Sequence, residues 1–180
     1  ILVSISMGGM VGSKWCQLYQ NDFTHFVIMN SSFKNFSGLT ERVQPKAILE
    51  FLKILKTNDH AQREKLIIQL CSNRTQKHDA ILEKWIELAQ ERSMSKENMA
   101  RQTFAAAKYK MNFRIPQKIL IIVAKNDRLA HYSCSLKLHE FWNSDLHVIE
   151  DPKVGHAIHI DASTEVPGII KEWYLKQSVY

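Results

Sequence analysis

Residues 118–124 constrain the fold most, because six consecutive apolar residues follow Lys118 with no polar residue among them. Such a short run, without the alternation of a half-exposed strand, is typical of a strand buried on both faces of a sheet. Residues 25–30 repeat the pattern in a shorter form. Strands of this kind occur in parallel sheets with helices on either side. We therefore expect an α/β fold.

Strand and helix patterns alternate toward both ends of the chain. The expected strands are residues 1–5, 25–30, 118–124 and 145–149, and the expected helices are residues 9–20, residues 133–142 and a last helix from about Pro167. Parallel strands joined by helices need right-handed crossovers, and their carboxyl ends meet at one edge of the sheet. Ligands bind at that edge in open α/β sheets.

The middle of the chain has a different pattern. Between about residues 40 and 109 the apolar residues recur at helical spacing, with Pro45 placed for a first helical turn. This predicts about four helices and no strand, inserted between two strands of the sheet. We expect three segments: residues 1–39 and 113–180 of an α/β core, and a helical cap at residues 40–112.

Composition narrows the function classes. A chain of 180 residues that is 45% hydrophobic can form one substantial core. The net charge of +6 is spread among acidic residues, which speaks against a nucleic-acid partner. No apolar run approaches the roughly 18 residues of a membrane span. We expect neither a bound metal nor a cofactor.

The three cysteines, Cys16, Cys71 and Cys134, are widely spaced and form no CxxC pair. We expect them to be reduced, which favours a cytoplasmic setting.

Ser6 lies where the first strand runs into a helix. Its surroundings read Ser4-Ile5-Ser6-Met7-Gly8-Gly9, one residue away from the G-x-S-x-G pattern of a nucleophile elbow. Small residues at Ser4 and Gly8 are expected to avoid a collision across the turn, and Gly9 to let the helix start close to the sheet. The alternative is an ordinary strand-to-helix turn with an inert hydroxyl.

Two more polar residues come after predicted strands. Asp127 follows the third strand, and His156 follows the fourth strand. Together with Ser6 they are expected to converge at the carboxyl edge of the sheet. The chain order Ser, Asp, His is the order of the triad in α/β-hydrolases.

In these features the sequence resembles the α/β-hydrolase superfamily, in its helical-cap, serine-nucleophile form. The resemblance rests on the Ser6 elbow, on residues 115–127 and on Gly155-His156, and it covers nearly the whole chain. It implies that Ser6 attacks an acyl carbon, that His156 is the base and that Asp127 orients the imidazole. It also implies that the Met7 backbone N–H is one oxyanion-hole donor.

The resemblance further implies an acyl-cleaving hydrolase of the ester, thioester or C–C type that acts on a small molecule. A serine nucleophile speaks against epoxide and haloalkane hydrolysis, which need a carboxylate there. The second oxyanion donor of the family comes from a region that would precede Ile1. The chain therefore resembles the carboxyl-terminal portion of such an enzyme, with an open sheet edge that exposes apolar surface and favours self-association. The alternatives are a non-catalytic binding module and a truncated, inactive hydrolase fragment.

The acid position has competitors. Asp127 could instead form a turn or pair with Arg128. Glu150 and Asp151 are alternative acids, although they precede His156 closely on one loop. The segment after the second strand, Asn30-Ser31-Ser32, offers no carboxylate.

For the base, His159 competes with His156, which is favoured by the preceding Gly155. We expect His159 to support the pocket or the loop after it, and Asp161 to be a cap or turn residue.

Overall fold

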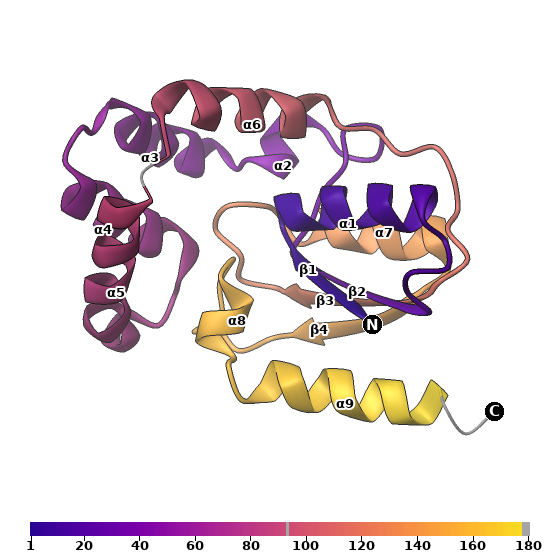
Figure 1. Ribbon diagram of the computed structural model, residues 1–180. Helices are drawn as coiled ribbons and strands as arrows, with labels where there is room; N and C mark the ends of the chain where they lie inside the picture. The colour runs from indigo at the N-terminus through magenta and orange to yellow at the C-terminus, as the bar shows by residue number, and fades with distance from the viewer. Residues whose placement is uncertain (93, 178–180) are drawn as a thin grey trace.

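The computed structural model describes residues 1–92 and 94–177 and shows a parallel sheet flanked by helices (Figure 1). The strands are β1 (Leu2–Ile5), β2 (His25–Met29), β3 (Lys118–Ala124) and β4 (Asp145–Ile149). They lie side by side in chain order, and each neighbouring pair is parallel. The α/β class and the four strands expected from the apolar runs are confirmed.

The helices of the core differ little from expectation. They are α1 (Met7–Leu18), α7 (Ser133–Trp142), α8 (Ile158–Asp161) and α9 (Glu165–Gln177). Both α1 and α9 begin two residues earlier than expected. The short α8, which follows His156 directly, was not predicted because four residues are too few to show a helical period.

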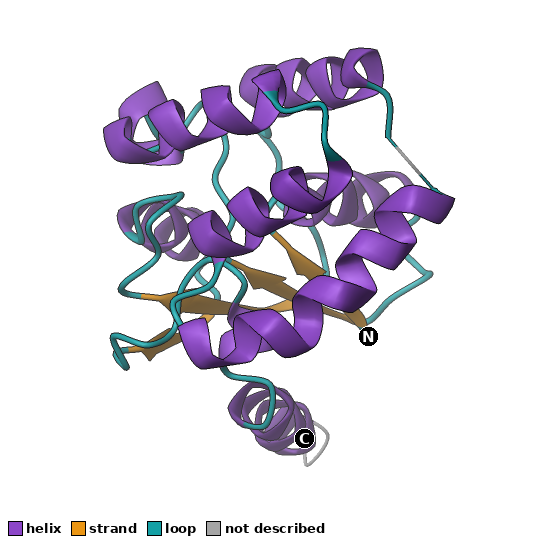
Figure 2. Cartoon of the chain, turned by 90° about the vertical axis from the view of Figure 1, so that its left-hand side faces the viewer, coloured by secondary structure: helices purple, strands orange, loops and turns teal. Residues whose placement is uncertain are grey.

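Alternate residues of the strands explain why the sheet is buried on both faces. Phe26 and Ile28 of β2 point into the core under α1 and α7, whereas Val27 and Met29 point into the core under α8 and α9. Side chains of a strand alternate between the two faces, so each apolar strand contributes to both cores. The sheet and its helices form three layers (Figures 1 and 2).

The described residues between 40 and 112 form helices and no strand, as expected, but more helices than the four or so expected. They comprise α2 (Leu39–Arg42), α3 (Pro45–Lys56), α4 (His60–Cys71), the 3₁₀ turn Thr75–Lys77, α5 (His78–Glu91) and α6 (Lys96–Lys108).

In Figure 1, α4 and α5 lie beyond the carboxyl ends of the strands, and α6 lies over α1. The division into a core and a cap stays a prediction, and residues 93 and 178–180 of the predicted segments lie outside the described part.

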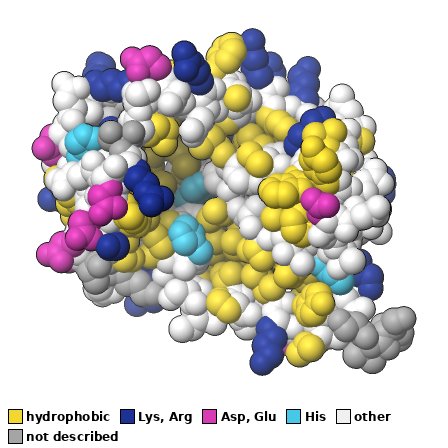
Figure 3. All heavy atoms as spheres, in the orientation of Figure 1, with side chains coloured by type: hydrophobic (Ala, Val, Ile, Leu, Met, Phe, Trp, Pro, Cys, Tyr) yellow, Lys and Arg dark blue, Asp and Glu magenta, His cyan; other side chains and the backbone are white. Residues whose placement is uncertain are grey.

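The strand β1 lies at an edge of the sheet, where it pairs with β2. Apolar side chains are exposed along it and on α1, among them Val3 at 46%, Val11 at 65% and Trp15 at 44%. Figure 3 shows hydrophobic side chains spread over this side of the molecule, around a hollow in which histidine is visible. The expected apolar exposure is confirmed, whereas self-association stays a prediction.

The cysteines are free thiols, as expected. Burial raises the pKa of Cys71 to about 12 and that of Cys16 to about 11, so neither is a reactive thiolate near neutral pH. In the described ranges 1–92 and 94–177, no helix has the length and apolar character needed to cross a membrane.

Candidate functional site

Ser6 lies on a strained turn between β1 and α1. Its φ of 53° and ψ of −122° place it in a region that residues with a side chain rarely adopt. Its N–H donates to Met29 O at 2.8 Å, and its own carbonyl accepts from Gly9 N at 2.9 Å. The sheet and the first helical turn thus hold the strained residue from both sides, as in a nucleophile elbow.

The hydroxyl of Ser6 is not used as a helix cap, although Ser6 is the N-cap residue of α1. A serine in this position usually accepts a hydrogen bond from the first turn. Among the residues that the structure describes, neither this hydroxyl nor the N–H of Met7 makes a hydrogen bond. Both groups therefore remain available to a ligand at the amino end of α1.

The two glycines after Ser6 play different roles. A Cβ on Gly9 would lie 2.6 Å from Ile28 Cδ1 and 2.6 Å from Ser31 Oγ, so only glycine lets α1 approach the sheet this closely. A Cβ on Gly8 would lie 3.8 Å from Ser4 Cβ, an ordinary contact. The prediction for Gly9 is confirmed. The Gly8 and Ser4 positions face each other across the turn, as predicted, but a single Cβ on Gly8 would make an ordinary contact there and not a collision.

Asp127 and His156 form a buried pair. His156 Nδ1 lies 2.6 Å from Asp127 Oδ2, and the two residues are 6% and 5% exposed. A carboxylate oxygen is an acceptor, so Nδ1 carries the proton and donates it. In the neutral imidazole, Nε2 is then the nitrogen without a proton and can accept one.

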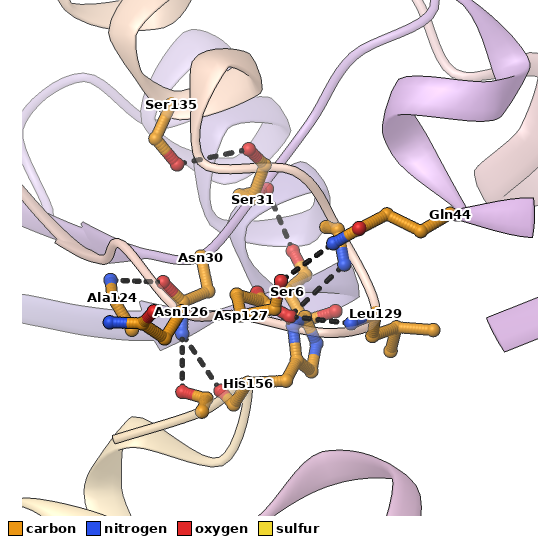
Figure 4. Close-up of polar contacts among 12 residues, drawn as sticks. Ser6, Asn30, Ser31, Gln44, Ala124, Asn126, Asp127, Leu129, Ser135 and His156 are labelled. Atoms are coloured by element: carbon orange, nitrogen blue, oxygen red, sulfur yellow. Dashed lines mark hydrogen bonds and ion pairs between the residues drawn. The ribbon is translucent and has the colours of Figure 1, made fainter. Parts of the chain in front are cut away.

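The second oxygen of Asp127 fixes the carboxylate itself. Asp127 Oδ1 accepts from Leu129 N at 2.8 Å and from Ala130 N at 3.0 Å. Asp127 therefore stabilises a turn, which was the alternative role expected for it, and also orients His156. Figure 4 shows Ser6, Asp127 and His156 together at the carboxyl edge of the sheet, each from a different strand's end.

The competing acids lie elsewhere. Glu150 pairs with Lys125 at 2.9 Å, and Asp151 pairs with Arg74 at 2.9 Å, both near the surface. Arg128 donates to the carbonyls of Gln69 and Ser72 in and after α4 and makes no ion pair with Asp127. Asp127 is therefore the carboxylate that orients His156.

His159 lies close enough to influence the site electrostatically. The pKa of His159 is lowered below the usual 6.5, first because partial desolvation disfavours its charged form, and second because a positive charge on His156 repels one on His159. Asp161 opposes these effects. The neutral form of His159 is favoured beside His156.

Asp161 has a larger role than the cap or turn residue that we expected. It is 1% exposed and accepts hydrogen bonds from Ser72 Oγ at 2.6 Å, Asn73 N at 2.9 Å and Gly155 N at 2.8 Å. It thereby joins the end of α4 to the loop that carries His156. Nothing in the local sequence signals this role, because two of the three donors lie 88 and 89 residues away.

The helical segment also contacts the acid loop. Gln44 Nε2 donates to Asp127 O at 2.6 Å, and Asn73 Nδ2 donates to Asn126 O at 3.0 Å.

A cavity of about 580 Å³ lies between α3, α4 and the loop after β3, with Asp127 in its wall. A second, more apolar groove of about 780 Å³ runs between α1 and α6 and begins at Met7.

No three histidine, cysteine or acidic residues come together in a metal-binding arrangement within the described part of the chain.

Comparisons with known proteins agree with the fold described above. The family model Hydrolase_4, described as serine aminopeptidase, S33, matches residues 1–163. No curated protein matches the chain significantly.

Solved structures resemble the chain in fold. One is a meta-cleavage product hydrolase from Pseudomonas fluorescens IP01, with 16% identity and a TM-score of 0.73, covering 97% of this chain and 64% of that one. Another is a thermophilic esterase, with 17% identity, a TM-score of 0.70, and 98% and 66% coverage. A third is an esterase from Exiguobacterium antarcticum, with 14% identity, a TM-score of 0.70, and 96% and 65% coverage. The chain spans just under two thirds of the length of these proteins.

Proposed function

The chain belongs to the α/β-hydrolase family whose model is described as serine aminopeptidase, S33, and from that membership we propose that it is a serine hydrolase that cleaves acyl bonds. Its proposed substrates are small-molecule esters or thioesters. Ser6 is the proposed nucleophile, His156 the base, and Asp127 the acid that orients it. Similar folds are found in esterases and in a hydrolase of meta-cleavage products, which supports this reaction class.

One observation carries the proposal. Ser6 has a strained backbone conformation, and its hydroxyl does not cap α1. It lies at the same edge of the sheet as the His156 imidazole, whose Nδ1 is 2.6 Å from Asp127 Oδ2. Backbone strain persists only where the surrounding structure stabilises it, and it concentrates at functional sites. A serine that served only as a turn residue would gain stability by capping α1.

In the proposed first step, Ser6 Oγ bonds to the acyl carbon while its proton moves to His156 Nε2. The carbonyl oxygen becomes an oxyanion, toward which the Met7 N–H would donate. The amino end of α1 favours negative charge at the same place. The bond to the leaving group then breaks as His156 returns the proton to it, which leaves an acyl group on Ser6.

The proposed second step repeats the first with water. His156 Nε2 takes a proton from water, whose oxygen attacks the acyl carbon, and the Ser6–acyl bond breaks. The proton on His156 returns to Ser6 Oγ, and the acid product leaves. Asp127 stays ionised throughout and stabilises the imidazolium that forms in each step.

We also propose a cytoplasmic setting, which the three free cysteines support.

The test is hydrolysis of a panel of short acyl esters and thioesters by the full-length protein. Ser6→Ala is expected to lower kcat on the order of 10⁴- to 10⁶-fold, and Asp127→Asn about 10⁴-fold, because the histidine then loses its orientation. Ser4→Ala is the matched control, since Ser4 Oγ donates to Val27 O of the neighbouring strand β2 and lies outside the proposed triad. Equal activity of the Ser6→Ala and Ser4→Ala variants would contradict the proposal.

The rival function is a non-catalytic module that uses the same pocket for binding. It predicts that the folded protein hydrolyses none of the panel and releases no initial burst of leaving group. A burst equal to one leaving group per protein would instead identify an acyl-enzyme.

A further inference from the structure

Asn30 follows β2 and uses its whole side-chain amide on the end of β3, from which the Asp127 loop leaves, and on the loop that carries His156. Asn30 Oδ1 accepts from Ala124 N at 2.9 Å, at the end of β3. Asn30 Nδ2 donates to Gly155 O at 3.2 Å and to His156 O at 2.9 Å. The residue is 2% exposed, so these partners replace water completely.

Ser31, the next residue, makes the corresponding contact with the nucleophile. Ser31 Oγ donates to Ser6 O at 2.8 Å, and Ser31 O accepts from Ser135 Oγ at 3.3 Å. The residue is 2% exposed. The missing side chain of Gly9 gives Ser31 its access to the elbow, because a Cβ there would lie 2.6 Å from Ser31 Oγ.

These two residues lie where the hydrogen bonds of the sheet end. The ladder between β2 and β3 reaches the Asn30 N–H, which donates to Ile122 O at 3.3 Å. Beyond that point the loops with Ser6, Asp127 and His156 leave three different strands. Figure 4 shows Asn30 and Ser31 between these loops, with bonds to each side.

We propose that Asn30 and Ser31 form a positioning clamp that sets the separation of the three proposed catalytic groups. The inference rests on the proposed function of Ser6, Asp127 and His156. Neither residue of the clamp needs to touch substrate, since each acts through backbone atoms of the catalytic loops. A misplacement of about 1 Å at a catalytic centre lowers rates by about 10²-fold, so a clamp at this place controls the chemical step.

A purely local role for Asn30 makes a different prediction. Its φ is 45°, a conformation that asparagine tolerates and glycine adopts freely. If the backbone conformation were the whole reason for asparagine here, Asn30→Gly would behave like the wild type. The clamp instead predicts a loss, because glycine lacks the amide.

Asn30→Asp separates the two halves of the amide. The carboxylate keeps the size of asparagine and still accepts from Ala124 N, but when ionised it cannot donate to the carbonyls of Gly155 and His156. Asn35→Asp is the matched control, because Asn35 also bridges backbone atoms, donating to Met111 O at 2.8 Å and accepting from Met111 N at 3.1 Å, away from the site.

The experiment measures the rate of covalent labelling by a fluorophosphonate in the full-length protein, resolved into the probe's apparent affinity and the maximal rate. For Asn30→Gly, Asn30→Asp and Ser31→Ala we expect the maximal rate to fall about 10- to 100-fold with unchanged affinity. The downfield proton resonance of His156 Nδ1–H, identified by its loss in His156→Ala, is expected to shift in the Asn30 variants. Asn35→Asp should change neither readout.

The clamp would be overturned if the folded Asn30 variants label at the wild-type rate with an unshifted resonance and Ser31→Ala also labels at the wild-type rate. If an Asn30 variant fails to fold, Ser31→Ala alone decides through its maximal rate. Failure of the proposed function looks different, because the wild type itself would then remain unlabelled.

Discussion

At the scale of single residues, Ser6 combines two costs. Its positive φ is unfavourable for a residue with a Cβ, and its hydroxyl forgoes the hydrogen bond that an N-cap serine usually accepts from the first turn. Each costs on the order of 1 kcal/mol or more. Their coincidence next to the Asp127–His156 pair is what distinguishes the elbow from an ordinary turn.

His159 gives a residue-scale prediction on pH. Its pKa in the folded protein is lowered from the usual 6.5, first by partial desolvation of the ring and then by repulsion from a charge on His156. A group with a lowered pKa contributes stability that is present above its unfolded value and is lost as pH falls through the folded value. Below pH 6.5 the unfolded chain therefore binds a proton at His159 that the folded chain resists.

We expect His159→Gln to reduce the loss of stability in this acid range. The measurement is the free energy of unfolding by denaturant at a series of pH values below 6.5, for the variant and the wild type. His25, whose pKa is also lowered, titrates in both proteins and cancels in the comparison. Parallel curves for the two proteins would contradict the assignment to His159.

At the scale of elements, the close approach of α1 to the sheet decides where the elbow lies. Gly9 allows this approach to Ile28 and Ser31, whereas Gly8 faces ordinary space beside Ser4. The contact brings the amino end of α1, where the Met7 N–H makes no hydrogen bond, to the carboxyl edge of the sheet. The helix position and the clamp at Ser31 therefore depend on one missing side chain.

Gly9→Ala and Gly8→Ala test this as a matched pair. The Gly9 variant is expected to lose about 1–3 kcal/mol of stability through overpacking. The Gly8 variant is expected to gain up to about 1 kcal/mol from helix propensity. Denaturant unfolding measures both, and a Gly9 variant as stable as the Gly8 variant would show that α1 does not need the close contact.

The elements were predictable from the sequence to different degrees. The apolar runs at residues 25–29 and 118–124 identified β2 and β3 because burial on both faces leaves no room for polar residues. Strand ends then indicated Ser6, Asp127 and His156, since parallel strands share one edge. The roles of Asn30 and Asp161 were not predictable, because their partners lie up to 126 residues away and no local pattern encodes them.

At the scale of the whole molecule, the helical segment and the core are joined at the site. Asp161 connects the end of α4 to the His156 loop, and Gln44 connects the start of α3 to Asp127. These contacts tie the loops that carry Asp127 and His156 to residues of the helical segment. How many helices this segment holds was not predictable, because α2 is only four residues long.

The exposed edge at β1 gives a prediction at this scale. Val3 is 46% exposed on the edge strand, and a charged residue there should oppose pairing with another chain. We expect residues 1–180 to associate with rising concentration in sedimentation, and Val3→Lys to weaken that association. Leu175→Lys adds the same charge at a 53% exposed site on α9 and is the control. Equal association of the two variants would rule out the edge as the contact.

Fluorophosphonate labelling of the full-length protein, followed by mass mapping of the adduct, tests most directly whether Ser6 is the nucleophile. Cleavage after Lys14 yields a peptide that contains Ser4, Ser6 and Ser13, so fragmentation must place the adduct among them. We predict one adduct per protein, on Ser6, and none after heat denaturation or in Ser6→Ala. A folded protein that stays unlabelled, or an adduct on Ser4, Ser13 or a residue outside this peptide, would contradict the account.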